Sequence, residues 1–292
     1  MNTNIRATIT VLIGATLLGS MGAWGRVVYR FEGDPMVVVT WRAIIGVAVL
    51  VTVLAATRPA LLRIPLPAIP FFLAYGFFGV TLNFWAYFSA VKYTTLAVAI
   101  TLLYTYPMFV TLFSAICLGE RLTRTKLAAA ALTVLGSALV AQIHQAEFLR
   151  LNLRGILFGL LTALSMAVYS ILGKRAVAQY APWTVVLYAF AGGALFLVLG
   201  SGRGLSAAWT YPPEAWLWLV GLALIPSLGG YALFTLGLRD LPASQVSIIA
   251  TWEVVTAALF GWYLFSEHLT ASQLVGAALV CAGIAWIQRV RA

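Results

Sequence analysis

The sequence predicts an all-α integral membrane protein with ten transmembrane helices, arranged as two inverted five-helix repeats around a central cavity. Three observations support this prediction. Of the 292 residues, 62% are hydrophobic and 9% are charged, whereas globular chains carry about 25% charged residues. The chain also divides into apolar stretches of about 20 residues, the length needed to cross a ~30 Å hydrocarbon core. Finally, the second half of the sequence repeats the first.

The repeat is clearest between residues 94–142 and 241–289, which align without a gap at an offset of 147. In this alignment Glu120 falls on Glu267, and each is followed two and three residues later by the pair Leu-Thr. Identical residues that recur at one fixed offset are typical of a duplicated unit.

The duplication extends to the front of each half, where an offset of 145 places aromatic Trp24 on aromatic Tyr169. We therefore expect a first five-helix unit at 1–146 and a second one at 147–292.

The ten expected spans follow one another with short connections. The first has Arg6 in front of it, as a secretory signal would, but its apolar run spans 19 residues without a convincing small-x-small cleavage site, so we expect a retained helix. The spans lie at about 7–25, 36–57, 66–91, 94–118, 124–142, 154–173, 182–200, 214–237, 242–265 and 270–288.

Basic residues are divided unevenly between the two sides of the predicted membrane. With an intracellular N-terminus, eleven Lys and Arg residues lie inside and six outside, which follows the positive-inside bias. Both termini and the turn at Glu120 should then be cytoplasmic, and the turn at Glu267 extracytoplasmic. Because five spans per half is an odd number, the second half enters the membrane upside down, as in many secondary transporters. The net charge of +10 is scattered between spans, so no nucleic-acid partner is expected.

Two prolines interrupt predicted spans. Pro107 lies within the fourth span and Pro226 within the eighth, and a proline inside a helix frees a carbonyl and bends the helix. Pro226 falls on Gly79 at the offset of 147, so the third and eighth spans could bend at matching depth. Such bends favour either a binding site at the membrane midplane or ordinary packing kinks.

The titratable residues do not predict catalysis. There are two histidines and no nucleophile motif, paired carboxylate or phosphate-binding loop. We expect no enzyme, no cofactor and no metal site. Cys117 and Cys281 have no metal or redox spacing and are interpreted as buried small hydrophobic residues.

Glu253 stands out because it lies about ten residues into the ninth span, near the bilayer midplane. A charge at this depth costs ~2.5 to 3.5 kcal/mol and usually faces a cavity or a partner. It could couple transport to protons, bind a substrate amine, or act as a protonated structural hydrogen-bonding group. Arg42 is shallower, so we expect it to extend outward to the interface in a structural role.

Tyrosines in the middle of spans also need explanation, because a buried hydroxyl requires a partner. Together with other polar and aromatic residues they could line a mildly polar cavity for a small organic solute. Trp24 and Tyr169 could in addition act as outer and inner gates, or simply anchor their helices at the interfaces. The candidate cavity residues are Trp24, Tyr75, Asn83, Tyr87, Tyr104, Tyr169, Ser227, Tyr231, Trp252 and Glu253.

The pattern of ten spans in two inverted halves of five resembles the drug/metabolite transporter superfamily, specifically its EamA family. The motif that carries the resemblance is Pro107 in the fourth span, followed by Gly119 and Glu120 at its end and then Arg121, Leu122 and Thr123. The resemblance covers essentially the whole chain. In the second half, Trp252 and Glu253 are similar to a hydrophobic-Glu pair of the family, but Val254 stands where proline is common and Ser266 where glycine is. These departures leave open whether the ninth span is kinked.

The length and the aromatic-rich spans look most like the aromatic amino acid exporters of bacterial inner membranes. This resemblance implies export of amino acids, aromatic or other bulky neutral ones preferred, by alternating access from a bacterial inner membrane. The expected partners are the amino acid substrate and the lipid bilayer, and we expect a monomer. Alternatives are a broad drug or nucleotide-precursor exporter and, from other classes, a membrane enzyme or a scaffold protein.

Overall fold

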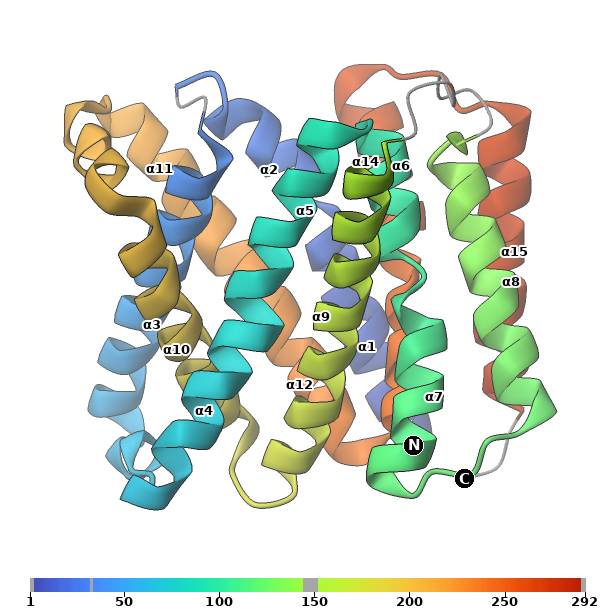
Figure 1. Ribbon diagram of the computed structural model, residues 1–292, viewed down its shortest axis with the longest axis horizontal. Helices are drawn as coiled ribbons and strands as arrows, with labels where there is room; N and C mark the ends of the chain where they lie inside the picture. Colours follow the sequence, from blue (N-terminus) through green and yellow to red (C-terminus); the bar gives the residue numbers. More distant parts are fainter. Residues whose placement is uncertain (1–2, 32–33, 144–151, 290–292) are drawn as a thin grey trace.

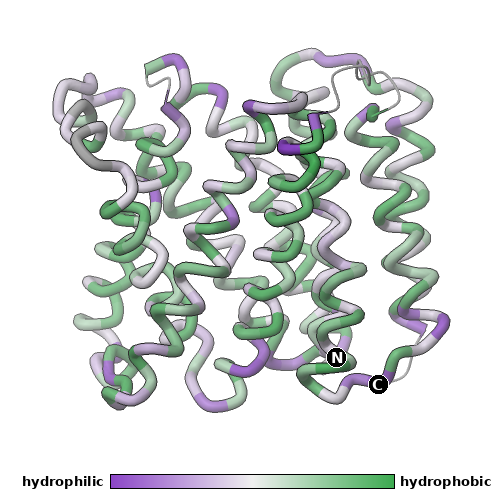
Figure 2. The backbone as a smooth tube through the Cα atoms, in the orientation of Figure 1, coloured by the Kyte–Doolittle hydropathy of each residue, from purple (hydrophilic) through white to green (hydrophobic). Residues whose placement is uncertain are grey.

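The computed structural model describes residues 3–31, 34–143 and 152–289, in which all regular elements are helical (Figure 1). Eight helical segments within these residues are long and apolar enough to cross a membrane. Hydrophobic residues dominate the middle of the segments, and the hydrophilic ones gather mainly near their ends (Figure 2). The prediction of an all-α integral membrane protein is therefore confirmed. The segments are Asn4–Val28, Pro35–Thr57, Leu66–Tyr93, Leu96–Leu118, Leu153–Val177, Pro182–Ser201, Pro213–Asp240 and Ala243–Phe265.

Several segments consist of more than one helix, because their backbones are interrupted inside the apolar stretch. In chain order the α-helices are α1 (Thr3–Gly19), α2 (Met21–Val28), α3 (Pro35–Thr57), α4 (Ile69–Gly76), α5 (Leu82–Tyr93), α6 (Leu96–Leu103), α7 (Tyr106–Leu118), α8 (Arg124–Val140), α9 (Leu153–Val177), α10 (Pro182–Ser201), α11 (Pro213–Leu222), α12 (Gly230–Asp240), α13 (Ala243–Ala250), α14 (Trp252–Phe265) and α15 (Ala271–Ile287). Short 3₁₀ turns cover Pro59–Leu62, Leu66–Ala68 and Gly202–Thr210.

The two remaining predicted spans correspond to α8 and α15, of 17 residues each. These helices lie side by side (Figure 1) and approach closely through small residues. A Cβ atom added at Gly136 would come within 2.6 Å of the Gly276 carbonyl oxygen, and one at Gly283 within 2.9 Å of the Ala129 oxygen. Close approach through glycine is a common way for helices to associate in lipid.

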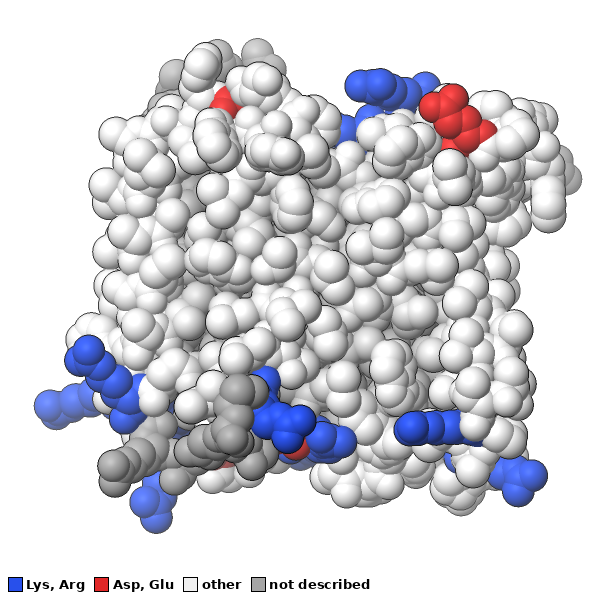
Figure 3. Space-filling model, turned by 180° about the vertical axis from the view of Figure 1, so that it is seen from behind, with Lys and Arg blue, Asp and Glu red and all other residues white. Residues whose placement is uncertain are grey.

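The two ends of the bundle differ in charge. On the face drawn in Figure 3, most Lys and Arg side chains gather at the end where α1 begins and α15 ends, and the middle of that face carries no charged side chain. A smaller basic group lies at the opposite end, beside acidic side chains. A charge-free band between two charged ends is the surface that a lipid bilayer requires.

Two helices end in the left-handed conformation at matching positions of the repeat. After α7 this residue is Gly119, with φ 70°, and after α14 it is Ser266, with φ 54°. Glycine adopts such φ values freely, whereas other L-residues do so at a cost of about 1 kcal/mol. Ser266 therefore adopts the same backbone conformation as Gly119.

The prediction that both cysteines are buried is wrong. Cys117 on α7 and Cys281 on α15 are exposed on the outside of the bundle. In a soluble protein an apolar helix position usually faces the core, but in a bilayer the outer surface is apolar as well. An apolar run therefore does not distinguish the interior from the lipid-facing side.

Candidate functional site

The helix breaks that shape the site occur at matching positions of the two halves. The fourth segment is interrupted between α6 and α7, just before Pro107, and the eighth candidate segment is interrupted at Thr251, between α13 and α14. Proline accounts for the first break. The second forms without one, so the ninth span, whose distortion the sequence left open because Val254 stands where proline is common, is interrupted at Thr251.

The expected distortions near Gly79 and Pro226 are also present, as π-helical turns at Phe77–Thr81 and Ala223–Gly229. Pro226 has no N–H to donate to the Leu222 carbonyl, and the Ser227 hydroxyl donates to it instead, at 2.8 Å. In the other turn the Phe78 carbonyl accepts a hydrogen bond from Ser165 of α9. Side chains thus satisfy the backbone groups that these turns release inside the membrane, and Ser227 has this structural task.

Glu253 lies in the first turn of α14, directly after the break at Thr251. Its carboxylate lies within interaction range of the hydroxyl of Tyr104, the residue at the break between α6 and α7. Tyr87 of α5, Tyr106 of α7 and Tyr231 of α12 are close enough to interact with it electrostatically. The helix breaks therefore bring one carboxylate into the midst of four tyrosines from three other membrane segments.

The side chains around Glu253 keep accessible surface deep in the bundle. Glu253, Tyr87 and Tyr231 are only half-buried, although protein surrounds all three. Tyr104 is almost fully buried beside them, and Trp252 is half-buried and donates from Nε1 to Thr16 of α1 at 3.1 Å. Groups deep in a bundle can keep accessible surface only where the helices leave a space between them.

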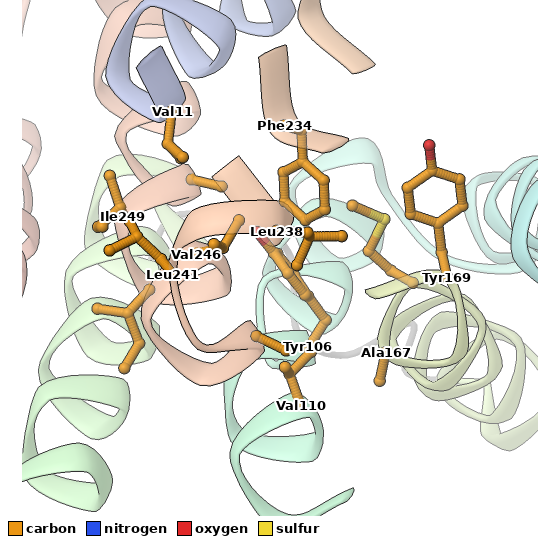
Figure 4. Packing of buried hydrophobic residues seen from close by; sticks show 14 of the residues in the cluster. Val11, Tyr106, Val110, Ala167, Tyr169, Phe234, Leu238, Leu241, Val246 and Ile249 are labelled. Carbon is orange, nitrogen blue, oxygen red and sulfur yellow. The ribbon is translucent and has the colours of Figure 1, made fainter. Parts of the chain in front are cut away.

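The half of the bundle nearer the start of α1 is closed by a packed layer. Side chains from α1, α7, α9, α12 and α13 meet there in one cluster, as the labelled residues of Figure 4 show. Tyr169 is fully buried against Phe234 and Tyr231, with ring centroids 6.1 and 5.4 Å apart, and against Tyr75 at 5.0 Å. The hydroxyls of Tyr75, Tyr169 and Thr235 lie near one another, and none of them meets full hydrogen-bond geometry. Tyr75 and Tyr169 therefore belong to this layer rather than to the space around Glu253.

Two further candidates contact neighbouring helices. Asn83 is buried and donates from Nδ2 to the Thr162 carbonyl of α9 at 3.1 Å. Trp24 packs between α2 and α11, edge-on to Trp218 at 5.5 Å and against the backbone at Gly221. These contacts place Asn83 in a helix junction and Trp24 in an aromatic cluster on the side of the bundle away from the packed layer.

A polar cluster joins the connection after α7 to the start of α13. The helix α13 begins after Pro242, which cannot cap it with a side chain, and Glu120 accepts the Ala243 N–H at 2.6 Å and the Ser244 hydroxyl. Lys126 pairs with the same carboxylate at 3.0 Å. A carboxylate at a helix N-terminus is favoured by the free N–H groups and by the helix dipole. Glu120 thus holds the two halves of the chain together at this end.

The counterpart of Glu120 in the second half is used differently. Glu267 forms an exposed ion pair with Arg26, and Arg26 also stacks over Phe265 at 4.3 Å. The helix that corresponds to α13 is α6, and it is capped locally by Thr95. The two ends of the bundle therefore carry equivalent carboxylates in non-equivalent contacts.

No group of three or more His, Cys, Asp or Glu side chains that could hold a metal ion occurs among the residues that the structure describes. The functional groups of the site are the carboxylate of Glu253, the hydroxyls of several tyrosines and the aromatic rings around them. Such a set can bind a cation or exchange a proton.

The sequence profile of the EamA-like transporter family matches residues 5–142 and, a second time, residues 153–289. The chain belongs to this family. The resemblance drawn from Glu120 and the residues around it is therefore confirmed, and this EamA-like chain is a transporter and not an enzyme.

Curated relatives of this EamA-like transporter include other transporters. An uncharacterized transporter of Archaeoglobus fulgidus is 32% identical over 206 residues, which are 69% of this chain and 71% of the relative. The pseudopaline exporter CntI of Pseudomonas aeruginosa is 26% identical over 87% of this chain and 86% of its own. The threonine/homoserine exporter RhtA of Escherichia coli K12 is 26% identical over 70% of this chain and 68% of its own.

A solved crystal structure has the same fold. It superimposes on the EamA-like chain with a TM-score of 0.78, covers 96% of both chains and is 21% identical in sequence. At this identity the likeness concerns the fold.

The residue of this EamA-like transporter whose surroundings the sequence analysis missed is Arg42. It does not extend outward to the interface but is buried inside the bundle, with 4% of its surface exposed. The guanidinium stacks over Phe84 at 4.4 Å and contacts the Met21 sulfur at 3.0 Å. The sequence signal for this burial is a lone cation within the apolar 23-residue helix α3, but the same pattern also fits a long side chain that snorkels from near a helix end.

Proposed function

We propose that this transporter exports amino acids, with a preference for aromatic or other bulky neutral ones, by alternating access. The observation that carries the proposal is Glu253, partly accessible deep in the bundle, close to Tyr87, Tyr104 and Tyr231. A carboxylate binds the ammonium group that all amino acids share, and aromatic rings suit cations and flat side chains. The threonine/homoserine export named for one relative supports the same substrate class.

The proposal includes a bacterial inner membrane, a monomer and ten membrane crossings, with α8 and α15 as the fifth and tenth. The units 1–146 and 147–292 would be inverted repeats on either side of a central cavity.

The positive-inside bias makes the basic end, where α1 begins, the cytoplasmic one. The packed layer around Tyr169 then closes the cytoplasmic half, which corresponds to an outward-facing state. In that state Tyr169 would act as the closed inner gate and Trp24 would flank the outer opening.

Reconstituted liposomes test the substrate class. We expect saturable, stereoselective efflux of radiolabelled L-phenylalanine from liposomes that contain the protein, and none from empty liposomes. Efflux of unrelated lipophilic cations without amino-acid flux would instead support the broad drug exporter. Absence of any flux by folded protein would contradict transport of either kind.

Cysteine labelling tests the inverted arrangement. Arg121 and His268 are matched at the offset of 147 and both are exposed, so each can be replaced by cysteine in a background without Cys117 and Cys281. We expect a membrane-impermeant maleimide to label the cysteine at 268 in whole cells and the one at 121 only after the membrane is opened. Labelling of both from the same side would contradict the inverted repeats.

A further inference from the structure

Arg42 is a buried cation that forms no ion pair with the residues that the structure describes. It lies in the interior of α3, 4% exposed, and its Nε has no hydrogen-bond partner. The contacts of the guanidinium are the Met21 sulfur and the face of the Phe84 ring. Among the residues described, the acidic side chains that form ion pairs do so with other bases, namely Arg26, Lys126 and Arg239.

These contacts do not compensate for burial. A sulfur atom is a weak acceptor, and stacking over a phenyl ring stabilises a cation far less than removal from water destabilises it. Arginine cannot lose its proton to avoid the cost. Among the described residues, the guanidinium therefore lacks the anionic partner that would offset its burial.

The position of Arg42 relative to Glu253 indicates which anion. Tyr231 is close enough to interact electrostatically with both Arg42 and Glu253. On the other side Tyr29 is close to Arg42, and Tyr87 is close to both Tyr29 and Glu253. A positive and a negative group thus lie near the same tyrosines, Tyr231 being close to both.

We propose that Arg42 binds the carboxylate of a zwitterionic substrate whose ammonium group lies at Glu253. The planar guanidinium presents two parallel N–H donors, which match the two oxygens of a carboxylate. The tyrosines between the charges contact the substrate body. The proposal rests on the proposed amino-acid export and adds to it a second charged subsite, one that makes the carboxylate as necessary as the amine.

Three probes with the same ring separate the two charges: L-phenylalanine, L-phenylalanine amide, which lacks the carboxylate, and N-acetyl-L-phenylalanine, which lacks the ammonium. In liposomes, the wild type should prefer phenylalanine to both analogues.

For Arg42→Gln we expect phenylalanine flux to fall about tenfold or more, while the flux of the amide stays within about twofold. The ratio of the two fluxes is the decisive quantity, because loss of folded protein lowers both equally. Arg154→Gln, an exposed arginine in the first turn of α9, is the matched control and should leave the ratio unchanged.

Two further measurements remain decisive if Arg42→Gln does not fold. Arg42→Lys keeps the charge but not the two-pronged geometry, and should reduce phenylalanine flux relative to the amide. In the wild type, phenylalanine should raise the melting temperature of the detergent-purified protein more than the amide does at the same concentration. Equal stabilisation by both ligands, or an unchanged flux ratio in Arg42→Gln, overturns the role of Arg42 while amino-acid export stands. If the folded wild type moves no amino acid at all, both proposals fall together.

Discussion

Replacing Glu253 with glutamine is expected to lower amino-acid efflux by about a hundredfold, because removing one member of a buried charge pair costs about 2 to 5 kcal/mol. Glutamine keeps the shape of the side chain and one oxygen that can accept from Tyr104, but it cannot balance a substrate ammonium. The variant should therefore fold and reach the membrane in normal amounts. Efflux of L-phenylalanine from liposomes, normalised to the amount of folded protein, measures the effect.

The same variant tests proton coupling. A carboxyl that holds a proton when the site is empty and releases it when the ammonium arrives would exchange one for the other, so wild-type efflux should change with pH. Any efflux that remains in Glu253→Gln should not change with pH. Glu267→Gln, which alters an exposed ion pair away from this site, should behave as the wild type. Wild-type rates in Glu253→Gln across the whole pH range would show that Glu253 is structural.

Replacing Glu120 with glutamine is expected to destabilise the protein by about 2 to 4 kcal/mol, since it breaks a buried ion pair and a charged helix cap. The side chains of Glu120 and Lys126 are only 12% and 8% exposed, so solvent screens the pair little. Thermal unfolding in detergent measures the change. The matched control is again Glu267→Gln, whose ion pair with Arg26 is about half exposed and should contribute less than about 1 kcal/mol.

The pH dependence of this difference has a definite sign. Burial alone would raise the pKa of Glu120, but hydrogen bonds from Ser244, Lys126 and Ala243 outweigh it and hold the pKa below its usual value of 4.5. A carboxyl with a lowered pKa in the folded state stabilises the protein above its unfolded-state pKa, and this contribution is lost as the pH falls through the folded-state pKa. The gap between wild type and Glu120→Gln should therefore be constant near neutral pH and shrink below about pH 4.5. A gap that grows on acidification would contradict this account.

The sequence predicts the helical segments well because each must be apolar for about 20 residues and must end in polar or turn-forming residues. It also predicts distortion at Pro226, where a donor is missing. It could not settle the break at Thr251, because no proline or glycine marks that position and tertiary contacts of Trp252 and Glu253 accompany it.

The candidate site was harder to predict because helical periodicity does not separate interior from lipid-facing positions when both are apolar. Asn83 and Ser227 look like cavity residues in the sequence, but each satisfies a carbonyl oxygen of the backbone. Cys117 looked buried and faces outward. The sequence indicates Glu253 because a carboxylate at midplane depth usually faces a cavity or a partner, whereas the packed surroundings of Arg42 do not allow the outward extension that its position in the sequence favours.

The burial of Arg42 also has a consequence for biogenesis. When α3 leaves the translocon, the pocket formed by Met21, Phe84 and their neighbours is not yet assembled, and an arginine in the lipid-exposed helix disfavours insertion by about 2.5 to 3.5 kcal/mol. Among the eight candidate segments in the described residues, α3 has the highest mean hydropathy, which offsets that penalty. Its outward-facing Val51 and Val53 are 40% and 49% exposed. Polar substitutions at these valines would therefore lower the yield of inserted protein, although both side chains lie outside the packed interior of the folded transporter.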